Sequence, residues 1–189
     1  MTIKHYCLPV PGMDVGKIRG ADLYGMRENP YSHLWKKHNG NDIGELQNGK
    51  AILGAPVVAT NYGIVKISKM QSNGKGYGNY VVILFDDGGG TLDCHLLDRT
   101  VKAGDKVEPG DVIGHVGSTG ESTGPHLHHG VFTKFNAADV SKSEWIDPLP
   151  ILKNIEEEDD MDENTVKKII QKEAEGSRST PSPWAKDAV

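Results

Sequence analysis

Hydrophobic and polar residues alternate in short stretches between residues 50 and 135, which is the pattern of half-buried β-strands. The stretch APVVATNYGIVKIS (55–68) is rich in Val and Ile, and YVVILF (80–85) is a continuous apolar run typical of a fully buried strand. TLDCHLL (91–97) and PHLHHGVF (125–132) are further strand candidates, and clusters of Gly and Asn separate the stretches as turns. The region leaves no room for crossover helices. We therefore expect an all-β fold, a compact antiparallel sheet or sandwich.

The flanking segments have a different character. Residues 1–49 are punctuated by Gly and Pro, and we expect them to pack as loops over the sheet within one domain covering residues 1–152. Residues 153–176 contain seven acidic residues at positions 156–163, followed by apolar residues at helical spacing, which predicts an acidic linker and a short helix. Residues 177–189 are rich in Ser and Pro and predict a flexible tail.

The net charge of −5 belongs to the C-terminal part of the chain. Residues 1–155 carry 16 Lys and Arg against 16 Asp and Glu, whereas residues 156–189 carry 5 against 10. This balance argues against a nucleic-acid-binding protein. No apolar run approaches the roughly 20 residues that cross a bilayer, so we expect no membrane insertion. The N-terminal residues lack the apolar core of a signal peptide, so we expect the protein to stay where it is made or to leave by another route.

Two cysteines, Cys7 and Cys94, lie far apart in the sequence. Two thiols do not make a disulfide framework, and the lack of an export signal favours reduced, structural thiols. A disulfide between them is the alternative.

Three histidines occur within four positions of the last strand candidate. His126 and His128 are two residues apart, so both side chains point to one face of a strand, and His129 points to the other. Two imidazoles on one face can approach a single point. Taken alone, such a pair is more often an ordinary core or surface pair.

A second cluster lies upstream, in HNGNDIG, where His38 and Asp42 flank Gly40. A loop bent at glycine can turn both side chains toward one ion. His, Asp and a second His form a nitrogen and oxygen ligand set suited to tetrahedral Zn²⁺, with the fourth position left for water. His95, in the middle of a strand candidate, is either a core histidine or a residue that holds the attacking water or an oxyanion beside the metal.

Four stretches follow one another in the order of a lysostaphin-like zinc metallopeptidase, and together they closely resemble that family. They are RGADLYGMRENPYSHLWKKHNGNDIG (19–44), GAPVVATNYGIVKIS (54–68), GYGNYVVILFDDGGGTLDCHLL (76–97) and VKAGDKVEPGDVIGHVGSTGESTGPHLHHGV (101–131). The similarity covers about residues 18–132. It implies a compact antiparallel β structure with the site in a groove lined by loops.

The resemblance assigns roles to the histidines. It implies that His38, Asp42 and His128 bind one Zn²⁺ per chain. It also implies that His126 and His95 are the catalytic histidines, which share proton transfer and stabilisation of the oxyanion. The usual substrates of the family are the peptide stems or cross-bridges of bacterial peptidoglycan.

Three positions depart from the family pattern. Asp93 stands where an aromatic residue such as Tyr is usual, His129 stands where an aromatic residue usually follows HLH, and Asn41 replaces an apolar residue. None of these changes removes a ligand. If the strand register is regular, Asp93 shares a face with His95 and could orient its imidazole.

Other candidates receive a structural interpretation. We expect His5, His33 and His115 to be surface or loop residues, with His33 as the next candidate ligand if His38 is not one. Strand alternation points Cys94 away from the metal, so it is expected to pack rather than to ligate.

The sequence therefore predicts a zinc endopeptidase that hydrolyses peptidoglycan peptides at the bacterial cell wall. The lack of a signal peptide favours a phage or prophage protein, either carried in the virion with phage structural proteins as partners or released from the host cytoplasm by lysis. The alternative is a catalytically silent module of the same fold that binds peptidoglycan or serves as a structural part of a virion or tail.

Overall fold

The computed structural model describes residues 7–30, 32–71, 75–86 and 88–158. The strands are β1 (Gly25–Glu28), β2 (Trp35–His38), β3 (Asn41–Ile43), β4 (Pro56–Val58), β5 (Gly63–Met70), β6 (Asn79–Phe85), β7 (Gly90–Leu96), β8 (Asp98–Arg99), β9 (Lys106–Val107), β10 (Val112–His115), β11 (Leu127–Lys134) and β12 (Glu144–Ile146). The helices are the 3₁₀ turns η1 (Val15–Lys17), η2 (Gly20–Asp22) and η4 (Val140–Lys142) and the α-helix α1 (Leu149–Glu158).

The central sheet has the strand order β12-β11-β7-β6-β5-β9, and β3 also pairs with β11. β4, β10 and β8 form a second, smaller sheet, and β1 pairs with β2 in a hairpin of its own. The pairs that join neighbouring strands are antiparallel. The predicted all-β, antiparallel fold is confirmed.

The core explains why the apolar runs become central strands. β6 and β7 are buried along nearly their whole length, as the continuous run at 80–85 predicts. One side of the sheet packs into the main core, which includes Val81, Ile83, Leu96 and Leu127. The other side packs into a smaller aromatic cluster around Phe132 and Trp145.

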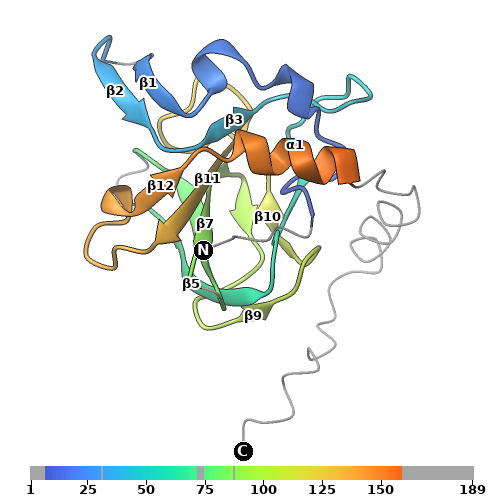
Figure 1. The fold of residues 1–189 in the computed structure, drawn as a ribbon, viewed down its shortest axis with the longest axis vertical. Coiled ribbons are helices and arrows are strands. Elements are labelled where there is room, and N and C mark those ends of the chain that lie inside the picture. The colour runs from blue at the N-terminus through green and yellow to red at the C-terminus, as the bar shows by residue number, and fades with distance from the viewer. Residues whose placement is uncertain (1–6, 31, 72–74, 87, 159–189) are drawn as a thin grey trace, which may run out of the picture.

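The N-terminal part of the chain contains more strand than its sequence indicates. Residues 25–43, expected as loops, form β1, β2 and β3, so that expectation is wrong for this segment. Within it, β1 and β2 show no apolar alternation because their hairpin stands out from the body at its upper edge (Figure 1), with Trp35 70% exposed. A strand that buries neither face leaves no hydrophobic pattern to find.

Helix α1 ties the C-terminal part of the described chain to the N-terminal part. It packs against η1, and Figure 1 shows the orange helix beside the blue N-terminal segment. Leu152 and Ile155 are buried in the main core. The domain boundary expected after residue 152 falls inside this helix, while the helix and tail predicted beyond residue 158 lie outside the described residues.

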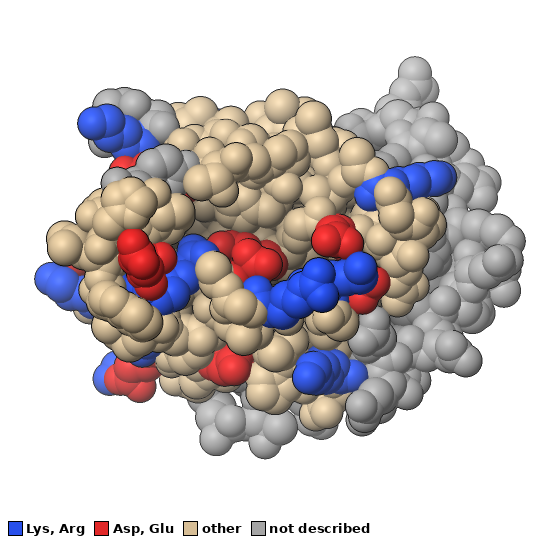
Figure 2. Space-filling model, turned by 90° about the horizontal axis from the view of Figure 1, so that it is seen from above, with Lys and Arg blue, Asp and Glu red and all other residues tan. Residues whose placement is uncertain are grey.

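The two cysteines are buried and no disulfide joins them, which confirms the prediction of structural thiols. The Cys7 thiol donates to the carbonyl of Ala59 at 3.3 Å, and Cys94 packs with Phe132 in the aromatic cluster. No helix among the described residues is long and apolar enough to cross a membrane. The face in Figure 2 carries Lys and Arg side chains next to Asp and Glu rather than a continuous basic surface.

The packing of α1 leads to a stability prediction. Leu152 is fully buried, whereas Lys153 is exposed. Leu152→Ala should lower the free energy of unfolding by about 3 kcal/mol, through lost apolar burial and the cavity left behind. Lys153→Ala should change it by less than about 0.5 kcal/mol. Urea unfolding followed by circular dichroism measures both, and equal stabilities would show that the helix does not contribute to the core.

Candidate metal centre and active site

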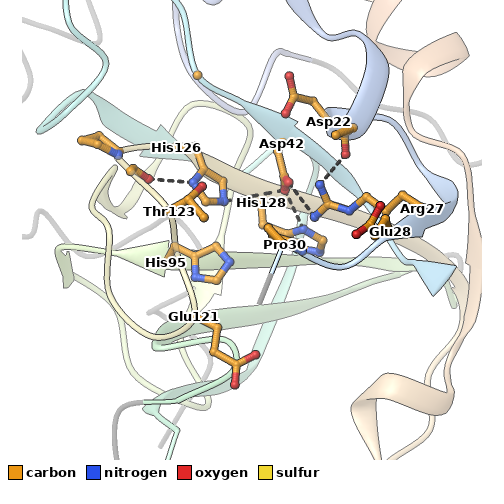
Figure 3. A pocket seen from close by; sticks show the side chains of 14 residues that line it. Asp22, Arg27, Glu28, Pro30, Asp42, His95, Glu121, Thr123, His126 and His128 are labelled. Carbon is orange, nitrogen blue, oxygen red and sulfur yellow. Dashed lines mark hydrogen bonds and ion pairs between the residues drawn. The ribbon is translucent and has the colours of Figure 1, made fainter. Parts of the chain in front are cut away.

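Three side chains from three strands converge at the predicted metal site. His38 ends β2, Asp42 lies in β3 and His128 lies in β11. The Nε2 atom of His38 is 3.1 Å from Oδ1 of Asp42 and 2.9 Å from Nδ1 of His128, and the last two atoms are 2.9 Å apart. The group is the kind that could hold a metal ion, and Figure 3 shows Asp42 and His128 side by side.

The local fold accounts for this convergence. β3 pairs antiparallel with β11 so that Asp42 lies directly opposite His128, and directly opposed residues share a face. The turn that carries His38 back to Asp42 passes very close to β11. A Cβ on Gly40 would lie 2.5 Å from the carbonyl oxygen of His129 and 2.9 Å from Cε1 of His128. Only glycine allows this approach.

The hydrogen bonds around the cluster decide whether it fits a cation. Nδ1 of His38 is 2.8 Å from the carbonyl oxygen of Leu23 and donates its proton there, so Nε2 presents a lone pair. That lone pair faces Oδ1 of Asp42 and Nδ1 of His128, and of these two atoms only the ring nitrogen can carry a hydrogen. Three electron-rich atoms at this spacing suit a divalent cation bound by nitrogen and oxygen, as Zn²⁺ is. The residues therefore fit zinc.

Asp42 is held in its ionised form. Burial raises the pKa of its carboxyl group, but the hydrogen bonds to His128 and His38 outweigh burial and hold the pKa well below its usual range. Its second oxygen, Oδ2, is 3.0 Å from a guanidinium nitrogen of Arg27. Arg27 also donates to the carbonyl of Ala21. The carboxylate thus offers one oxygen to the metal position while the guanidinium holds the other.

His95 and His126 stand beside the cluster with the same tautomer. Nδ1 of His95 donates to the carbonyl of Thr119 at 2.8 Å, and Nδ1 of His126 donates to the carbonyl of Gly124 at 2.8 Å. Both Nε2 atoms are left as lone pairs, and the ring centroids are 4.7 Å apart. Both side chains line the same pocket (Figure 3).

Burial lowers the pKa of His95 to about 4, and the neighbouring His128 and His126 act in the same direction. His95 is therefore neutral at ordinary pH and able to accept a proton. Its backbone is in the left-handed region, with φ of 61°. Its N–H donates to the carbonyl of Tyr77 at 3.0 Å, and its carbonyl accepts from the N–H of Thr119 at 3.3 Å.

The irregular backbone at His95 overturns one expectation. Asp93 does not orient His95, because the carbonyl of Thr119 does so. Oδ1 of Asp93 is instead 2.7 Å from Nδ1 of His129. Alternation along a regular strand would place Asp93 and His95 on one face, and the positive φ breaks that alternation.

A pocket of about 350 Å³ opens beside the cluster, and residues 21–30 contribute part of its wall. Four of the five predicted site residues line it, namely Asp42, His95, His126 and His128. Three acidic residues that the sequence did not single out also line it: Asp22, Glu28 and Glu121. Burial, then the neighbouring Asp42, raises the pKa of Asp22. Arg27 was missed as well, since an isolated Arg in an irregular segment carries no signal of its partner.

The remaining histidines are outside this group. His33 is exposed, with Nδ1 3.0 Å from Oε1 of Glu28, and His115 pairs with Asp98 at 2.7 Å. His5 lies outside the described residues. Cys94 packs in the aromatic cluster, as expected, and is not part of the candidate metal group.

The fold and the site are those of a metallopeptidase. The sequence pattern of peptidase family M23 matches residues 36–142, and the chain belongs to this family, which confirms the resemblance found in the sequence. A solved relative, the catalytic domain of the antimicrobial peptidase lysostaphin from Staphylococcus simulans, is 29% identical with a TM-score of 0.57, over 74% of this chain and 95% of that one.

Two curated relatives are more similar in sequence. The DD-carboxypeptidase/endopeptidase Mpg of Neisseria meningitidis is 41% identical over 111 residues, which are 59% of this chain and 24% of the relative. The peptidoglycan DD-endopeptidase ShyC of Vibrio cholerae is 39% identical over 104 residues, 54% of this chain and 22% of the relative. The matched region thus spans about a quarter of these relatives.

Metal binding by the cluster can be tested against the rival ligand. Asp42→Ala should weaken zinc binding about 100-fold or more, because it removes a ligand and leaves two imidazoles. His33→Ala should bind zinc as the unmodified protein does, because His33 is exposed and turned to Glu28. Competition with a chromophoric chelator measures both affinities. A loss in His33→Ala equal to that in Asp42→Ala would reassign the site.

The buried, neutral state of His95 predicts a pH dependence of stability. Its pKa is about 4 in the folded protein, against an ordinary value of 6.5 in an unfolded chain. The contribution of this neutral His95 to the free energy of unfolding is complete above pH 6.5. It is lost as the pH falls toward 4, because the unfolded chain binds the proton first. The loss between pH 7 and pH 5 is about 2 kcal/mol. Metal-stripped His95→Gln should therefore lose less stability over this range than the metal-stripped parent, and equal losses in urea unfolding would contradict the assignment.

Proposed function

We propose that the chain is a zinc-dependent endopeptidase that hydrolyses peptide bonds in the stems or cross-bridges of bacterial peptidoglycan. The observation that carries the proposal is the convergence of His38, Asp42 and His128, with two further unprotonated Nε2 atoms, beside one open pocket. The names of the M23 relatives support the substrate class.

When bound, zinc would polarise the scissile carbonyl and lower the pKa of water at the site. His38, Asp42 and His128 would hold it, with Arg27 fixing the carboxylate. Nδ1 of His38 donates to a backbone carbonyl, which keeps its Nε2 directed toward Asp42 and His128.

The two other histidines would carry the protons. Nε2 of His95 accepts the proton of the water whose oxygen attacks the carbonyl carbon, since its Nδ1 already holds a hydrogen. Nε2 of His126 lies 3.8 Å from Oδ1 of Asp42, on the edge of the metal position, where its ring, once it holds the proton taken from the water, can donate to the oxyanion. The proton then passes to the amide nitrogen as the C–N bond breaks. With the two histidines in these roles, the proton transfers need no glutamate of the described chain as a general base.

The test is digestion of purified peptidoglycan of several chemotypes, with and without a zinc chelator, and identification of the products by mass spectrometry. We expect chelator-sensitive release of peptides from at least one wall type. His95→Ala should bind zinc normally and release at least about 100-fold less product, because it loses the proton acceptor but no ligand. Absence of a chelator-sensitive product from every wall type would favour the catalytically silent binding or structural module.

The phage or prophage origin stays a prediction from the sequence. With it stand the localisation in a virion or release by lysis, and the partnership with phage structural proteins. Detection of the chain in purified particles by mass spectrometry would test all three.

A further inference from the structure

A line of buried polar side chains runs across the sheet directly behind the candidate metal ligands. Asn41 of β3 lies opposite His129 of β11, and His129 lies opposite Asp93 of β7. The three residues are 0%, 0% and 1% exposed. Because directly opposed residues on antiparallel strands share a face, they form one line across three strands, which we call the polar row.

The polar row and the metal ligands are neighbouring rungs of the same strand ladder. The next line in the register joins Asp42, His128 and Cys94. Successive residues of a strand point to opposite faces, so this line faces the site while the polar row faces the main core. Any change in the pairing of β11 with its neighbours would therefore move both lines together.

The members of the polar row are far apart in the sequence, yet they meet side by side in the fold. Two of them, His129 and Asp93, also contact each other through their side chains.

The contact within the row is specific. Nδ1 of His129 is 2.7 Å from Oδ1 of Asp93, and both side chains are fully buried. A pair of apolar residues of the same size would be at least as stabilising here, since removing two polar groups from water costs much of what their attraction returns. Stability alone therefore does not account for the pair.

Register does account for it. If β11 slipped by two residues along β7, His129 would face Thr91 or His95, and Asp93 would be buried without its partner. That state is strongly disfavoured, whereas in an apolar row a slip by two residues keeps every side chain on its own face and buries no unpaired polar group. A hydrogen-bonded pair in a buried row permits one register only.

We propose that His129 and Asp93 are positioning residues, whose hydrogen bond locks β11 against β7 and thereby holds His128 in place against Asp42 and His95. The role of the pair in turnover rests on the proposed endopeptidase function. Its effect on the metal site does not, because the geometry of the ligands can be measured through zinc affinity alone.

The decisive variant is the double replacement Asp93→Leu with His129→Leu, which removes the hydrogen bond without leaving either of its two partners buried and unpaired. Its thermal midpoint should stay within a few degrees of the parent. Its zinc affinity, measured by chelator competition, should fall about tenfold. The kcat for release of peptides from the wall should fall, while KM changes less than about twofold. A purely structural role would leave zinc affinity and kcat at parental values once stability is retained.

Asn41→Val is the matched control. Asn41 is as buried as the pair and adjoins a ligand, but its amide atoms have no hydrogen-bond partner among the described residues. This variant should bind zinc as the parent does. Asp93→Asn keeps the shape of the side chain and weakens the bond, and it should lose about threefold in zinc affinity.

Parental zinc affinity in the double variant would overturn the proposal, as would an equal loss in Asn41→Val. Should the double variant fail to fold, Asp93→Asn decides in the same way: affinity equal to that of Asn41→Val overturns the proposal, and a selective loss supports it. If the parent releases no wall peptide, the proposed function fails, and the zinc affinities still decide the positioning role.

Discussion

The pairing of β3 with β11 is the contact on which the site depends. It sets Asp42 opposite His128, and the turn before β3 returns His38 to the same point. The turn fits because Gly40 has no Cβ, since a Cβ there would lie only 2.5 Å from the carbonyl oxygen of His129. Three side chains separated by up to 90 positions thus come together at one candidate metal site through a short stretch of backbone hydrogen bonds.

Backbone carbonyls also decide the chemistry of the imidazoles. His38, His95 and His126 each donate from Nδ1 to a carbonyl oxygen, of Leu23, Thr119 and Gly124 respectively. Each is left with a lone pair on Nε2. Because a carbonyl oxygen only accepts hydrogen bonds, it fixes which ring nitrogen carries the hydrogen in each neutral imidazole, and no second carboxylate is needed for this. The loops that supply these carbonyls therefore set the orientation of the three rings.

The fold class and the residues of the candidate site could be predicted from the sequence. The exposed hairpin and the hydrogen-bond partners behind the site could not. Alternating apolar residues report burial on one face, so the central strands were predictable, whereas the exposed hairpin at residues 25–38 has no such pattern. His38, Asp42 and His128 were expected as ligands from their residue types and from the family resemblance, and the structure brings the three side chains together. The partner of Asp93 could not be found, because it depends on the register of β11 and on the single residue where β7 leaves regular geometry.

That residue is His95, a non-glycine held at a φ of 61°. A side chain in this conformation costs about 1 kcal/mol relative to glycine. Glycine at this position would relax the backbone, but it would also remove a buried imidazole and its hydrogen bond to the carbonyl of Thr119. The packing and the hydrogen bond of the ring thus offset the strain of its own backbone, so the unusual backbone and the imidazole depend on each other.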